Sequence, residues 1–134
     1  MAAGGQKHLK TMQFSGRELQ AILKMANAMI MADGKVDKNE IRVMTTELLR
    51  FGVPHDHVEK LLKGANLMDG TEALTILASL DEERKKYVSS YLGTIMISDG
   101  DIDDKEMALW RLISTLCGFP SMNVVDAINN MSEL

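Results

Sequence analysis

The sequence is poor in the residues that cross-link or rigidify several classes of protein. Among 134 residues it has one cysteine, two prolines and 4% aromatic residues. Cys117 has no second cysteine with which to form an internal disulfide, so we expect a reducing, cytoplasmic location. The net charge of −4 argues against a broad basic surface, so nucleic acid is not an expected partner.

Long apolar runs are also absent. No segment approaches the roughly 18 consecutive apolar residues of a transmembrane helix, so we expect no insertion into a membrane. The first eight residues carry charge but no apolar stretch follows them, unlike a secretory signal. We expect a flexible tail at residues 1–12 and a single domain at residues 13–134. No glycine-rich phosphate loop or serine elbow is present, so we predict no enzymatic activity.

Apolar residues recur at helical spacing along most of the chain, as Leu19, Ile22 and Ala26 do near its start. No sustained alternation of apolar and polar residues predicts a strand, so we expect an all-α fold of about seven helices. The predicted helices span residues 15–32, 37–51, 55–63, 71–80, 82–98, 103–117 and 121–131. Capping boxes are predicted at Ser15 with Glu18, Asp37 with Glu40, and Asp103 with Glu106.

The chain contains an internal repeat. Residues 33–54 and 99–120 share six identities at 22 aligned positions, including an Asp-Gly pair and a later Gly-x-Pro. The repeat predicts two helix-hairpin units, at about 14–64 and 80–131, related by a pseudo-twofold axis within one globule. Residues 55–80 carry no motif that we can interpret.

The two copies of the repeated turn are rich in carboxylates, and these residues are the candidate metal ligands. They are Asp33, Asp37, Glu40, Asp99, Asp101, Asp103 and Glu106. Carboxylate oxygens suit Ca²⁺ or Mg²⁺, which need several oxygens converging on one point. The second turn is the more acidic and could hold an ion alone, or the pseudo-twofold could bring both turns to one shared ion.

Helix capping offers a simpler explanation for four of these residues, because Asp37, Glu40, Asp103 and Glu106 are all in the predicted capping boxes. The turn is not an EF-hand, since its glycine is second and its glutamate eighth. Capping does not explain Asp33 and Asp99. Each follows the C-terminal end of a predicted helix, where the helix dipole disfavours an anion.

The segment from Met31 to Glu40 resembles a known family on the strength of its Ala-Asp-Gly, Val36, Asp37 and Glu40. The second copy, Ser98 to Glu106, matches the same pattern. The family is that of the tellurite-resistance protein TerB and the related N-terminal domain of DjlA-type co-chaperones. The resemblance covers roughly residues 15–132 and implies an all-helical fold. It also implies that the acidic residues bind divalent cations or protein partners in a stress response.

Three further features predict local packing. Cys117 is expected to be buried and inert, and the Trp110 N–H to meet a polar neighbour between helices. Among the eleven methionines, Met12, Met68, Met122 and Met131 are the ones expected to be more exposed. A methionine-lined groove, involving Met68 or Met122, would suit the alternative function: a metal-independent scaffold for an unidentified protein partner.

Overall fold

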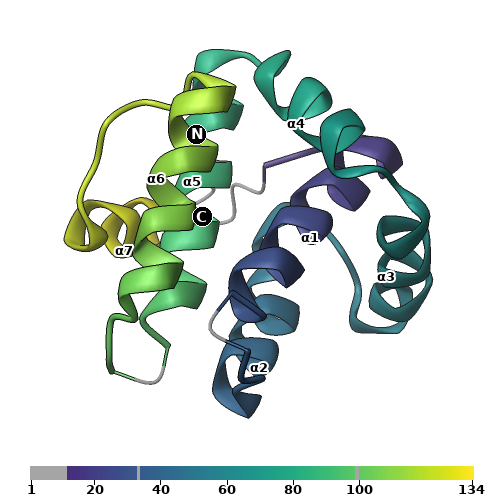
Figure 1. Cartoon of the computed structure of the whole chain (residues 1–134). Coiled ribbons are helices and arrows are strands. Elements are labelled where there is room, and N and C mark those ends of the chain that lie inside the picture. The colour runs from purple at the N-terminus through teal and green to yellow at the C-terminus, as the bar shows by residue number, and fades with distance from the viewer. Residues whose placement is uncertain (1–11, 33, 99) are drawn as a thin grey trace, which may run out of the picture.

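The computed structural model describes residues 12–32, 34–98 and 100–134. Within these ranges the chain forms helices connected by turns and contains no strand, which confirms the all-α prediction (Figure 1). The α-helices are α1 (Gly16–Ile30), α2 (Lys38–Glu47), α3 (Val58–Leu67), α4 (Gly70–Ala78), α5 (Glu82–Met96), α6 (Asp104–Cys117) and α7 (Val124–Ser132). Two 3-10 helices, η2 (Leu48–Phe51) and η3 (His55–His57), lie between α2 and α3.

The two longest helices, α1 and α5, pack against each other and contribute more buried apolar side chains than any other helix. Helix α1 also contacts α3 and α4, whereas α5 contacts α2, α6 and α7 (Figure 1). The buried apolar side chains of all these helices form one core cluster. Burial of the core is the main favourable contribution to folding of a chain of this length.

Two contacts fix α5 in this core. The Tyr91 hydroxyl, which is fully buried, donates a 2.7 Å hydrogen bond to the Met44 carbonyl of α2. On the other side, Gly93 lets α6 and α7 come close, because a Cβ atom there would lie 2.8 Å from Trp110 Cζ2 and 2.9 Å from Ala127 Cβ. Helix α5 therefore contributes to the relative positions of α2, α6 and α7.

Most predicted helices are present, with differences at their ends. Residues 37–51 form α2 followed by η2, and the predicted helix 121–131 begins later, at Val124, because Asn123 makes a capping box with Asp126. Pro120 therefore lies in the preceding loop. Residues 64–67, which were not part of any predicted helix, belong to α3.

Met12 was expected to belong to a flexible tail at residues 1–12. Met12 is 4% exposed and its N–H donates to the Arg50 carbonyl, so it belongs to the packed domain, while residues 1–11 lie outside the described ranges. No helix in the described ranges is long and apolar enough to cross a lipid bilayer. The pseudo-twofold relation between the halves stays a prediction, although several local features recur in both.

Candidate functional site

The turns after α1 and α5 share the conformation of one glycine and the type of helix cap that follows it. Gly34 and Gly100 adopt φ angles of 80° and 88°, a left-handed conformation that favours glycine. Three residues after each glycine an aspartate caps the next helix. Asp37 Oδ1 accepts hydrogen bonds from the N–H groups of Asn39, at 2.7 Å, and Glu40, at 3.3 Å.

Asp103 Oδ1 repeats this arrangement, accepting from Lys105 N at 2.8 Å and Glu106 N at 3.1 Å. Both predicted caps are thus confirmed. In both Asp37 and Asp103, the capping hydrogen bonds go to Oδ1, and none of them goes to Oδ2. Capping therefore leaves each carboxylate with an oxygen that could bind a cation.

The predicted capping boxes at α2 and α6 form only by half, because the return bond from the glutamate is missing. At α1 the box is complete, because Glu18 Oε1 accepts from Ser15 N at 2.8 Å and Ser15 Oγ from Glu18 N at 3.1 Å. At α2 and α6 the glutamate makes no such return bond, so the prediction is wrong on this point. Glu40 and Glu106 are instead 4% and 3% exposed. Capping alone therefore does not explain why glutamates occupy these two positions.

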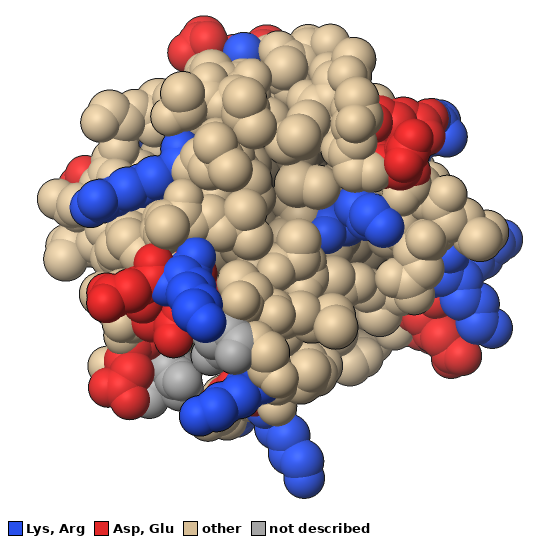
Figure 2. Space-filling view, viewed as in Figure 1, with Lys and Arg blue, Asp and Glu red and all other residues tan. Residues whose placement is uncertain are grey.

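The two turns meet in one pocket of about 480 Å³. Its lining residues are Lys35, Val36, Asp37 and Glu40 from the first turn and Asp101, Ile102, Asp103 and Glu106 from the second. Each turn contributes the same four positions, 66 residues apart in sequence. The pocket therefore has five carboxylates and one lysine, and in Figure 2 charged side chains gather at the lower left of the molecule, where the ends of these hairpins lie.

Burial makes this pocket electrostatically unusual. A carboxylate removed from water is stable in its charged form only when hydrogen bonds or opposite charges compensate for lost solvation. Glu40 and Glu106 are buried, and Glu40, Glu106, Asp101 and Lys35 each make at least one interaction with another group. An added cation would act on a site that already holds several negative groups close together.

Five of the seven candidate ligands line this pocket: Asp37, Glu40, Asp101, Asp103 and Glu106. The remaining two, Asp33 and Asp99, lie outside the described residues. Among the residues that are described, no three carboxylate, histidine or cysteine side chains form a group that could hold a metal ion by themselves. The prediction of a cation site thus stays a prediction.

Sequence reasoning missed three of the lining residues, Lys35, Val36 and Ile102. Val36 and Ile102 are 57% and 50% exposed, so they give the pocket an apolar rim. The signal that would have found them is the repeat itself, because Ile102 and Val36 occupy the same position in the two turns. The residue equivalent to Lys35 in the second turn is Asp101, which carries the opposite charge.

The predictions about single residues away from the turns have mixed outcomes. Cys117 is 1% exposed, and burial raises the pKa of its thiol, as an inert cysteine requires. Trp110 Nε1 donates to the Ser89 carbonyl at 3.0 Å, as predicted. Met12, Met68 and Met131 were expected to be more exposed but are buried, because all three pack into the core. Met122 is partly buried and packs against it.

These observations define a class of protein: an all-α domain in which two acidic turns, far apart in sequence, line one pocket. The family model described as tellurite resistance protein TerB matches residues 19–128, so the chain belongs to the TerB family. It is also similar to a crystal structure of a protein of unknown function from Porphyromonas gingivalis W83. The two share 60% identity with a TM-score of 0.84, over 91% of this chain and 92% of that chain. No curated protein matches the chain.

Proposed function

We propose that this TerB-family domain is non-enzymatic and binds one divalent cation, Ca²⁺ or Mg²⁺, between its two acidic turns. The single observation that supports the proposal is the pairing of equivalent carboxylates from both turns in one pocket. Hard cations of this kind take oxygen ligands from several side chains at once. In this proposal Asp33 and Asp99 complete the ligand set.

A bound cation would compensate the negative charge of the turns and hold the α1–α2 and α5–α6 hairpins together. The domain would then present a different surface to a protein partner with and without the ion. A stress-response role, which the family description suggests through tellurite resistance, is part of this proposal. So is the cytoplasmic location expected from the single cysteine.

The experiment separates capping from ion binding by substituting the two N-cap aspartates. Asparagine caps a helix about as well as aspartate but lacks the charge, whereas alanine loses the cap at a cost of about 1 kcal/mol. In chelator, Asp37→Asn and Asp103→Asn should therefore unfold close to the wild type, and the alanine variants should be less stable. In Ca²⁺ or Mg²⁺ at 100 times Kd, the wild type should gain about 2.7 kcal/mol, and both asparagine variants much less.

Asp81→Asn is the matched control. Asp81 caps α5 through a 2.8 Å bond to Arg84 N but does not line the acidic pocket. Its asparagine variant should keep the full cation response. A wild-type melting curve that millimolar Ca²⁺ and Mg²⁺ leave unmoved would remove the cation from the proposal.

The alternative is a scaffold that binds a protein partner without any ion. The exposed apolar side chains of Val36 and Ile102 beside the pocket favour it, in place of the methionine groove expected from the sequence. It predicts a partner that binds in the presence of chelator and is lost in Val36→Ser with Ile102→Ser. Leu67→Ser, at a 90% exposed position on α3, is the control that should retain binding.

A further inference from the structure

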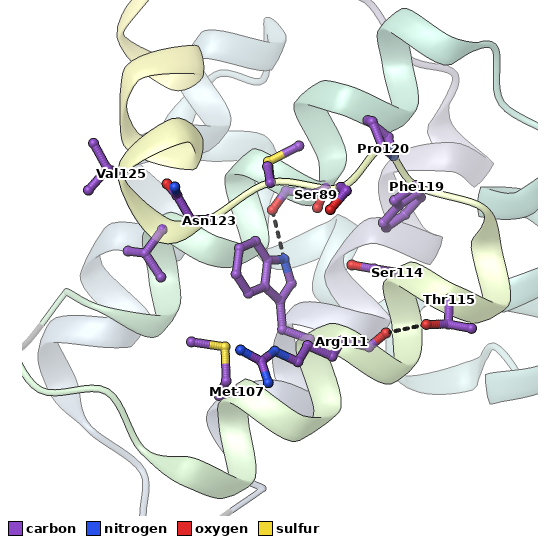
Figure 3. Close-up of a pocket in the computed structure, with 13 residues that line it drawn as sticks. Ser89, Met107, Arg111, Ser114, Thr115, Phe119, Pro120, Asn123 and Val125 are labelled. Atoms are coloured by element: carbon purple, nitrogen blue, oxygen red, sulfur yellow. Dashed lines mark hydrogen bonds between the residues drawn. The ribbon is translucent and has the colours of Figure 1, made fainter.

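A second pocket lies along α6, from Met107 to Thr115, and shares no lining residue with the acidic pocket. It is bounded by α6, the loop 118–123 and the first residues of α7, with Ser89 of α5 on its inner side (Figure 3). Its volume is about 700 Å³. Pockets that bind small organic molecules commonly have volumes of roughly 300–1,000 Å³, so this one has room for such a ligand.

The walls of this pocket are largely apolar and already in place. Trp110 and Met107 come from α6, Phe119 from the loop, and Met122 and Val124 from the segment that leads into α7. The indole is fixed by its hydrogen bond to the Ser89 carbonyl, drawn as a dashed line in Figure 3. A pocket held in this way loses little conformational freedom when a ligand enters.

Asn130 anchors the far wall. Its Nδ2 donates to Ser90 Oγ at 3.0 Å, so α7 is tied to α5 behind the pocket. Met122 packs against both of these side chains. Because methionine adapts its shape readily, this wall can accommodate ligands of somewhat different outline.

Two polar groups of the pocket lack partners within the described residues. Ser89 is 1% exposed, and its Oγ makes no hydrogen bond there, which is uncommon for a buried hydroxyl. The Arg111 guanidinium, at the exposed side of the pocket, makes no ion pair or hydrogen bond with any described residue. Apolar walls that end in an uncompensated positive charge complement an apolar molecule that carries one negative charge.

We propose that this pocket binds a small organic acid with an apolar body. The body lies against Trp110 and Phe119, and the carboxylate pairs with the Arg111 guanidinium. This site is separate from the acidic pocket and does not depend on a bound cation.

Decanoate is a suitable probe, and Trp110 is a built-in reporter because it is the only tryptophan. Titration with decanoate should change the tryptophan fluorescence saturably, and decan-1-ol, which has the same chain without the charge, should bind at least about tenfold more weakly. Circular dichroism on the same samples should show an unchanged helical signal. The absence of a saturable change would overturn the proposal, as would equal binding of decan-1-ol.

Two pairs of variants locate the site. Arg111→Gln should weaken decanoate binding about tenfold. Lys60→Gln, which removes a positive charge from an exposed position on α3, should leave decanoate binding unchanged. Ser114→Phe fills the pocket and should abolish binding, whereas Ala108→Phe, at an exposed position of α6 outside the pocket, should not. If Arg111→Gln bound decanoate with full affinity, the proposal of a small-acid site would be refuted. The same holds if the fluorescence changed with an added peptide that has an apolar C-terminus but not with decanoate.

Discussion

Replacement of Gly93 by alanine tests the close packing of α5 against α6 and α7. A Cβ atom at this position would lie 2.8 Å from Trp110 Cζ2 and 2.9 Å from Ala127 Cβ. Ordinary carbon–carbon contacts are about 3.5–4.0 Å, so these neighbours must retreat by roughly 0.6–1.2 Å. Both belong to helices packed against α5, and neither contact involves the end of a flexible chain.

Overpacking of this kind costs about 1–3 kcal/mol, and the better helix propensity of alanine offsets up to about 1 kcal/mol of it. The free energy of unfolding should therefore fall by about 1–2 kcal/mol, which lowers Tm by several degrees in a domain of this size. Chemical denaturation and calorimetry measure both quantities. The tryptophan emission should also change, because Trp110 must move relative to the Ser89 carbonyl.

Gly70→Ala is the matched control. Gly70 is the first residue of α4, and a Cβ atom there would meet nothing within 4 Å. Its replacement should leave stability unchanged or raise it by up to about 1 kcal/mol. If Gly93→Ala were as stable as the wild type, or both variants changed stability alike, the close approach of α5, α6 and α7 would be wrong.

Two further predictions concern buried titratable groups. Burial, together with a 3.0 Å hydrogen bond to Glu133, raises the pKa of Tyr87 to about 12 from a usual value of 10.0. As pH rises, the Tyr87 hydroxyl loses its proton at a lower pH in the unfolded chain than in the folded one. The free energy of unfolding should therefore fall between pH 10.0 and about 12. Measured by denaturation at several pH values, Tyr87→Phe should lack this part of the decrease. Burial also raises the pKa of the Cys117 thiol, which is inaccessible in the folded protein. Thiol reagents at neutral pH should therefore label Cys117 only as fast as the fold opens. Rapid labelling of the folded protein would contradict the packing.

Local features of the fold were predictable from the sequence because they depend on neighbouring residues. The aspartates that cap α2 and α6 and the glycines that precede them belong to a motif within a few positions, and the structure confirms all of them. The predicted start of the last helix at residue 121 was wrong, because α7 begins at Val124. Asn123 and Asp126 form a complete capping box there, and this local signal was overlooked.

The burial of Glu40 and Glu106 could not be predicted in the same way. Their spacing from the caps matches a capping box, and only the approach of the other turn decides that the side chains are buried. The α6–α7 pocket likewise depends on Ser89 and Met122, which are distant in sequence. The repeat did suggest that the turns could meet, because equivalent hairpins in one globule place equivalent turns near a common axis.

The most direct test of a cation shared by both turns is isothermal titration calorimetry with Ca²⁺ and with Mg²⁺. For at least one of these ions we predict one ion per chain, and loss of that binding in either Asp37→Asn or Asp103→Asn alone. Two ions per chain, each lost with only one of the substitutions, would contradict a shared site. Because a binding enthalpy can be zero at one temperature, each titration is repeated at a second temperature. The absence of binding heat for both ions at both temperatures would contradict cation binding altogether.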